Sequence, residues 1–352
     1  MTEGLDERLL ASATATLELF SVYIGTRLNL YAVMAEQGAM NACRLAEAAG
    51  IDARYAREWL EQQAVAGLLC VDDATQPAEE RTFALPAEHR GVLVDVDDLA
   101  HLAPLAQMVV GVAGVLDLVV DAYRSGGGVP YRLYGSAFRQ GQAGVNRPAF
   151  TSELTGSWLP AMPDLHERLS RPGARVADVG CGLGYSSIAL AKAYPDAEII
   201  GIDTDAASVD EARVAARQAG VSVRFVAGDA AELASHAPFD AVLVLEALHD
   251  MARPVEVLLA ARKALTDEGS LIVVDERVHA TFTSPGDEIE RFMYGWSVSH
   301  CLPASRAEQP SAALGTVLRQ DQVIELAADA GFRHTEVTDI EAGFFRVYRL
   351  HV

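Results

Sequence analysis

Glycine, acidic and hydroxyl residues stand close together in the stretch VADVGCGLGYSS, residues 176–187. An apolar run ends at Asp178, and Gly180, Gly182 and Gly184 follow at every second position before a helical pattern begins. A strand, a glycine turn and a helix N-terminus in this order form a site for a ligand with polar or negative groups.

The spacing of these glycines narrows the choice of ligand. A dinucleotide fingerprint has the form G-x-G-x-x-G. Here the third glycine comes one residue early, and Tyr185 stands in its expected place. The chain also lacks the G-x-x-x-x-G-K-[ST] run of a P-loop. The pattern excludes a P-loop and argues against an NAD(P) oxidoreductase, which remains the first rival function.

Further polar residues follow the next predicted strands, at the edge of the sheet where ligands of such folds bind. They are Asp203-Thr204-Asp205 after the second strand, Gly228-Asp229-Ala230 after the third, and Glu246 with His249-Asp250 after the fourth.

With these motifs, residues 175–276 resemble the core of class I S-adenosylmethionine (SAM)-dependent methyltransferases. "DVGCGLG", "GID" and "AGDA" stand at that family's successive strand ends, and "EALHD" is similar to bacterial relatives of the plant O-methyltransferases. The resemblance implies SAM as the cofactor and a small, apolar or aromatic methyl acceptor, with O-methylation favoured and N- or C-methylation open. The implied cofactor-binding residues are Asp178, Gly180, Gly182, Gly184, Asp203, Thr204, Asp229, Ala230 and Glu246.

Within this resemblance, each acid has an expected partner. Asp203 would accept both ribose hydroxyls, because a carboxylate offers two oxygens. Asp229 with the backbone of Ala230 would bind the adenine, and Glu246 the methionine amine. Asp178 would hold either the methionine ammonium or the loop itself.

The resemblance also implies a catalytic base. "LHDM" places His249 where the plant enzymes have the histidine of "LHDW", and a near-neutral pKa suits this work. Asp275, with Glu276 beside it, stands for the family's supporting glutamate, whereas a second supporting glutamate is missing. Two alternatives stay open. In the first, His249 has a structural role alone and caps a helix or closes the pocket. In the second, it joins Asp250 and His300 in a metal site for C-methylation of a 2-oxo acid.

The back half of the chain must position these residues. Strand patterns at 175–180, 197–203, 223–229, 239–246 and 269–276 alternate with helical patterns. Such alternation predicts a doubly wound parallel α/β sheet, Rossmann-like and seven-stranded once two closely spaced antiparallel strands at the C-terminus are added. The insertion 283–316 carries Phe292, Met293, Tyr294 and Trp296, which together suggest an apolar acceptor pocket.

The front third predicts an α-rich winged-helix domain. Helical patterns at 18–34, 42–49 and 53–66 precede two short strands. Residues 1–90 hold seven arginines and no lysine against fourteen acids, whereas a DNA reader needs a basic face. We therefore expect a dimerisation domain and no nucleic-acid partner; a winged-helix regulator that senses SAM is the second rival. The expected domains are 1–95, a helical linker 96–165 and the SAM-binding domain 166–352.

Composition sets the remaining expectations. The 352 residues carry a formal net charge of −21, which repels polyanions. Four scattered cysteines without a CxxC pair, and an N-terminus without a basic and apolar leader, indicate free thiols in the cytoplasm. The apolar stretch 102–116 is too short to cross a membrane, so we expect no membrane partner. Stretches 18–34 and 102–116 are expected to bury their apolar surface in a homodimer.

Overall fold

The computed structural model describes residues 4–352 and divides into two compact units. The first comprises the chain up to Ala113 together with Ser136–Pro148, and the second comprises Gly114–Gly135 and Ala149–Val352. The segment 96–165, expected as one linker, is thus divided between the units. Helix α8 (Gly135–Pro148) packs on α6 (Pro104–Ala113), because Gly111 and Gly141 allow the two backbones to approach.

The first unit has the helices and the wing of the predicted winged-helix domain. Its elements are α1 (Leu5–Arg27), α2 (Leu30–Gln37), α3 (Ala42–Ala49), α4 (Ala53–Val65), β1 (Cys70–Val71), β2 (Phe83–Ala84), α5 (Arg90–Leu93), α6 and α8. The helix expected at 18–34 is two helices instead. Asn29 has a φ of 56°, a left-handed conformation that ends regular helix, so the chain turns between α1 and α2.

Helix α1 exposes much of its apolar surface. Leu10, Leu17 and Ile24 recur every seven residues and are each at least 46% exposed. Among the single helices of the described chain, α1 alone is long and apolar enough to cross a membrane by length and composition. Exposed apolar surface of this kind is typical of interaction sites.

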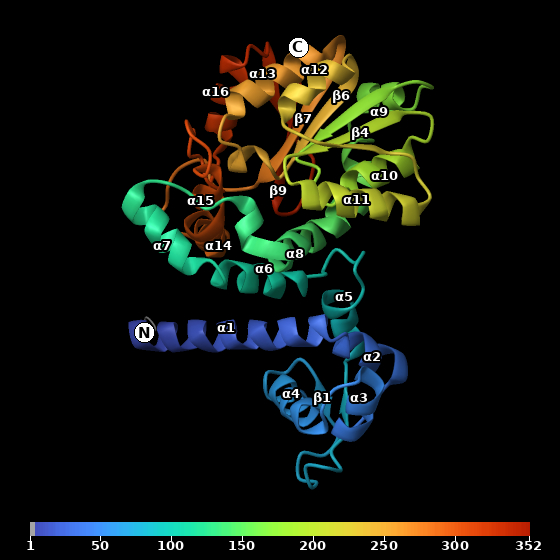
Figure 1. Ribbon diagram of the computed structural model, residues 1–352, viewed down its shortest axis with the longest axis vertical. Helices are drawn as coiled ribbons and strands as arrows, with labels where there is room; N and C mark the ends of the chain where they lie inside the picture. The colour runs from blue at the N-terminus through green and yellow to red at the C-terminus, as the bar shows by residue number, and fades with distance from the viewer. Residues whose placement is uncertain (1–3) are drawn as a thin grey trace. The chain divides into compact units, whose positions relative to one another are not determined.

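The second unit is built on a seven-stranded sheet with helices on both faces (Figure 1). The strand order is β5-β4-β3-β6-β7-β9-β8, with β3 to β7 parallel and β9 antiparallel to both β7 and β8. This confirms the doubly wound sheet and its antiparallel end. The strands are β3 (Arg175–Val179), β4 (Glu198–Asp203), β5 (Arg224–Ala227), β6 (Phe239–Leu245), β7 (Leu265–Glu276), β8 (His334–Val337) and β9 (Phe345–His351).

Apolar residues alternate between two cores, one on each face of the sheet. Ala177 packs into the core that faces α13 (Pro254–Ala264) and α16 (Gln320–Asp329), whereas its neighbour Val176 packs into the core under the segment 149–169. The helices of this unit are α7 (Leu116–Ser125), α9 (Pro163–Leu169), α10 (Tyr185–Ala193), α11 (Ala206–Ala219), α12 (Leu233–His236), α13 (Pro254–Ala264), α14 (Glu288–Trp296), α15 (Leu302–Ser305) and α16 (Gln320–Asp329), with π-helical turns at Ala149–Trp158 and Ser297–Cys301.

The insertion after β7 forms α14 and α15. The large apolar and aromatic residues of α14 differ in burial: Met293 is buried, but Phe292 and Tyr294 are exposed. Phe292 packs edge-on against Trp296. An acceptor pocket formed by these residues stays a prediction.

Candidate active site

The glycine turn between β3 and α10 adopts the backbone that its sequence predicts. Gly180, Gly182 and Gly184 have φ values of 78°, 52° and 77°, in the left-handed region that favours glycine. A Cβ on Gly180 would lie 2.8 Å from Ala247, and one on Gly184 would lie 2.6 Å from the Phe225 ring. A Cβ on Gly182 would meet no atom within 4 Å. The outer two glycines pack on the protein, and the middle one faces open space that a ligand can fill.

Asp178 holds this turn to the following helix. One oxygen of its buried carboxylate accepts hydrogen bonds from the hydroxyls of Ser186 and Ser187, both at 2.6 Å. Burial raises the pKa of Asp178. Of its two expected roles, these contacts match that of holding the loop; contact with a methionine ammonium stays a prediction.

Asp203, at the end of β4, links two loops of the site. Its Oδ2 accepts the backbone N–H of Gly182 at 2.8 Å, and its Oδ1 accepts that of Asp205 at 2.8 Å. Burial raises the pKa of Asp203 to about 6. Each carboxylate oxygen can accept a second hydrogen bond, so the fixed carboxylate is able to bind a diol. Thr204 beside it is exposed.

At the end of β5, Asp229 is exposed and caps the short turn that follows, accepting the N–H of Ala231 at 2.8 Å. Ala230 is buried. Asp203 and Asp229 follow neighbouring parallel strands, β4 and β5, so both lie at the same edge of the sheet.

Glu246 leaves β6 in an unusual conformation. Its φ is 49°, which is rare for a residue with a side chain, and its N–H donates to Val274 O at 2.6 Å. Strained backbone of this kind costs on the order of 1–3 kcal/mol and gathers at functional sites. Burial raises the pKa of Glu246 to about 8.

His249 lies one turn further and is 1% exposed. Its Nδ1 is 2.8 Å from Asp275 Oδ1 and 3.3 Å from Glu276 Oε2, at the end of β7. Its Nε2 is 3.5 Å from Asp250 Oδ1. The histidine and the acid that the sequence pattern offers as its support, Asp275, are therefore in direct contact.

The charges around His249 oppose its burial. Burial alone would lower the pKa of the imidazole, but the carboxylates of Asp275, Glu276 and Asp250 outweigh it and hold this pKa well above its usual value. Burial would raise the pKa of Asp275, yet His249 holds it below its usual value. Burial also raises the pKa of Glu276. Near neutral pH the cluster thus contains a buried ion pair, Asp275 with the imidazolium.

The donor set considered for a metal is not brought together. Among the described residues, His249 shares a compact donor group with Asp275 and Glu276, and another with Asp250 and Cys301. His300 belongs to neither group. Its ring, in the π-helical turn Ser297–Cys301, packs edge-on against Tyr134, with ring centroids 4.5 Å apart. Cys301, which the sequence pattern did not single out, joins His249 and Asp250 in place of His300; its one signal in the sequence is its position beside His300.

Comparisons with known proteins agree with this geometry. Residues 170–328 match the family model of a methyltransferase domain, and residues 15–94 match that of an Rv2258c-like winged HTH domain. A ubiquinone biosynthesis O-methyltransferase of Xanthomonas campestris is 34% identical over 108 residues, 30% of this chain and 44% of the relative. The chain therefore spans less than half the length of this relative.

Solved structures match the fold over the whole chain. A putative O-methyltransferase from Nostoc punctiforme has a TM-score of 0.69 at 18% identity, covering 100% of both chains. Human N-acetylserotonin methyltransferase, solved in complex with SAM, has a TM-score of 0.68 at 16% identity, covering 99% of this chain and 98% of the other. The chain therefore contains a methyltransferase domain at residues 170–328 and a winged HTH domain at residues 15–94, and it has the fold of the solved methyltransferases.

Proposed function

We propose that the protein transfers a methyl group from SAM to an oxygen of a small apolar or aromatic acceptor. The observation that carries the proposal is the open space at Gly182 beside the fixed carboxylate of Asp203, with the His249–Asp275 pair at the same edge of the sheet. The named relatives that methylate oxygen support the choice of acceptor atom.

The residues present suit this cofactor. The glycine turn would receive the methionine part, Asp203 the ribose hydroxyls, Asp229 and Ala230 the adenine, and Glu246 the methionine amine. SAM supplies a methyl group on a sulfonium, so no phosphate has to be held, which agrees with the absence of lysine or arginine from residues 176–187.

His249 would act as the base that takes the proton of the acceptor hydroxyl. Asp275 holds Nδ1, which directs Nε2 toward the acceptor side and stabilises the imidazolium that the proton transfer produces. Because His249 is already protonated near neutral pH in the free protein, it has to lose its proton before it can act. We therefore expect activity to rise with pH above the ordinary histidine range.

The test compares two glycines with the same backbone demand. A Cβ at Gly182 or at Gly173 meets no protein atom within 4 Å, and both residues have positive φ. Gly182→Ala should weaken SAM binding at least about tenfold, because the methyl group enters the ligand space; Gly173→Ala, outside the site, should leave it unchanged. Calorimetry with SAM and with NADH measures both variants. Equal SAM affinity in the two variants, or tight NADH binding, would contradict the proposal.

We further propose a cytoplasmic homodimer that uses α1 and does not bind nucleic acid. The exposed residues Leu10, Leu17 and Ile24 of α1 support pairing with the same helix of a second copy, since a seven-residue repeat is the pattern of paired helices. The four cysteines are free thiols, as expected in a reducing compartment. The acid excess of residues 1–90 argues against DNA.

A further inference from the structure

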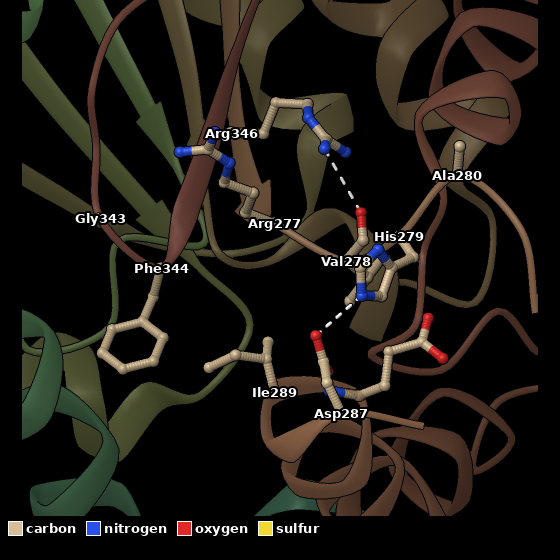
Figure 2. A pocket seen from close by; sticks show the side chains of 10 residues that line it. Arg277, Val278, His279, Ala280, Asp287, Ile289, Gly343, Phe344 and Arg346 are labelled. Carbon is tan, nitrogen blue, oxygen red and sulfur yellow. Dashed lines mark hydrogen bonds and ion pairs between the residues drawn. The ribbon is translucent and has the colours of Figure 1, made fainter. Parts of the chain in front are cut away.

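A hollow of about 690 Å³ lies beyond the end of β7 (Figure 2). We call it the arginine pocket. Three segments line it: residues 277–280 after β7, residues 287–290 at the start of α14, and residues 343–346 leading into β9. Its volume lies in the range of small-molecule sites.

The arginine pocket begins where the His249 cluster ends. Arg277 directly follows Glu276, and its N–H donates to Phe344 O at 2.7 Å. Arg346 on β9 is the register partner of Asp275 on β7. Partners in an antiparallel pair project from the same face of a sheet, so Arg346 shares its face with the carboxylate that holds His249.

The acids of the arginine pocket are already paired. Asp287 Oδ2 is 2.7 Å from His279 Nε2, the contact dashed in Figure 2. Glu290 Oε1 accepts from Arg319 at 2.8 Å. Glu290 is thus paired with a permanent cation and Asp287 with a histidine, and the salt bridges of the described residues join neither acid to Arg277 or Arg346.

The guanidinium groups of Arg277 and Arg346 can each donate further hydrogen bonds. Arg346 donates from Nη2 to Val278 O at 3.3 Å and its positive charge acts on the Tyr348 hydroxyl, whereas its buried Nη1 makes no hydrogen bond within residues 4–352 that meets the geometric criteria. The Arg277 side chain donates to the exposed carboxylate of Glu341 at 3.3 Å, a contact that solvent weakens. A buried donor without a partner destabilises the protein. In a chain of net charge −21, two arginines on one small surface indicate a binding site for an anion.

The opposite side of the arginine pocket is apolar. In Figure 2, Phe344 and Ile289 lie below Arg277 and Arg346, and the Phe344 ring points away from the two arginines. Phe344 is 53% exposed although it is a large aromatic residue. A ligand that fits both sides has an apolar or aromatic body and an acid group, for which the planar fork of arginine is well suited.

We propose that the arginine pocket binds a carboxylate of the methyl acceptor, so that the acceptor is an aromatic or apolar acid. This inference rests on the proposed methyl transfer, but the binding site itself can be tested without it. Arg277 and Arg346 are then specificity-determining residues.

The first experiment measures binding in the absence of SAM. 4-Fluorobenzoate and its neutral counterpart 4-fluorobenzamide are titrated into the full-length protein and followed by fluorine NMR. We expect the acid to bind and the amide to bind at least about tenfold more weakly, since a charge-assisted contact is lost. Arg277→Gln and Arg346→Gln should each weaken the acid about tenfold or more, and Arg333→Gln, at an exposed arginine just before β8, should not.

Glu341→Gln is expected to increase the affinity for the acid, an effect that a damaged fold would not produce. It frees Arg277 from its competing carboxylate and should tighten binding of the acid about two- to fivefold. Equal binding of acid and amide, no binding of either, or an unchanged affinity in all three pocket variants would overturn the arginine pocket as an anion site. Tighter binding of inorganic phosphate than of 4-fluorobenzoate would overturn the choice of carboxylate.

The second experiment tests whether binding in the arginine pocket contributes to methyl transfer. Production of S-adenosylhomocysteine is measured with phenols offered as matched acid and amide pairs. Faster turnover of the acids, lost in Arg346→Gln as a raised KM with kcat retained, supports the proposal. Equal turnover of acids and amides overturns it while leaving methyl transfer intact. If SAM binds but no phenol of either kind is turned over while the acid still binds, the proposed O-methylation fails and the anion site stands.

Discussion

The protonation state of His249 depends on one neighbour above all. Asp275→Asn removes a negative charge 2.8 Å from Nδ1 and keeps the size of the side chain. An opposite charge at this distance shifts a pKa by about 1–3 units, and one unit corresponds to about 1.4 kcal/mol. We therefore expect the pKa of His249, held well above its usual value in the wild type, to fall by about 1–3 units in the variant.

Glu276→Gln serves as the matched control. Glu276 Oε2 is also close to Nδ1, at 3.3 Å, but burial raises the pKa of this carboxyl well above its usual value. Glu276 acts on His249 over a longer distance than Asp275 does, so its replacement removes a weaker electrostatic contribution. The expected shift in the pKa of His249 is smaller than that produced by Asp275→Asn.

The assay is a pH titration of the histidine side chains by nitrogen-15 NMR, with His249→Gln identifying the resonance by its loss. It needs neither cofactor nor acceptor. A wild-type His249 that titrates at or below about 6.5, or one that Asp275→Asn does not move, would refute this account of the cluster.

The same pair sets a stability window. A raised His249 pKa contributes stability that is complete below its unfolded value, about 6.5, and is lost as pH rises through the folded pKa. A lowered Asp275 pKa contributes stability above its unfolded value, about 3.9, that is lost as pH falls through the folded pKa. Glu246 acts in the opposite sense, since its raised pKa costs stability as pH rises toward about 8. Urea denaturation of Asp275→Asn should show a loss of about 3–5 kcal/mol near pH 6, shrinking above the folded pKa of His249.

Three further predictions concern the cofactor, the base and the assembly. Asp203→Ala should weaken SAM binding by about 1.5–3 kcal/mol, because the ribose hydroxyls lose a charged acceptor; unchanged affinity by calorimetry would remove Asp203 from the site. His249→Ala should leave SAM affinity nearly intact and lower the methylation rate by about 10²–10⁴, and a variant with nearly full rate on the acceptor would exclude His249 as the base. Light scattering at micromolar concentration should give a dimeric mass for the wild type, and Leu10→Ser with Leu17→Ser should shift it toward the monomer; a monomeric wild type would count against the helix α1 interface.

Local patterns in the sequence were enough for most elements. Helix α3 spans the predicted 42–49, and the predicted strand ends carry Asp178, Asp203 and Glu246 at or next to the observed ends. The predicted boundaries of helices and strands were wrong where the sequence pattern did not mark the end of the element. The apolar period runs across Asn29, whose left-handed backbone separates α1 from α2. Similarly, β7 begins at Leu265, four residues before the predicted 269, because its polar start resembles a turn.

The sequence by itself determined the fold class, the glycine turn and the set of strand-end acids, because periodicity and spacing are properties of neighbouring residues. Only the tertiary structure decided which of them meet. His249 reaches Asp275 across 26 residues because β6 and β7 are adjacent parallel strands. Arg346 comes to the same sheet edge because β9 pairs antiparallel with β7, a register that no local pattern specifies. The pKa values of this cluster follow from burial and from nearby charges. Both depend on the tertiary structure, because only the folded chain buries these groups and brings the charges together.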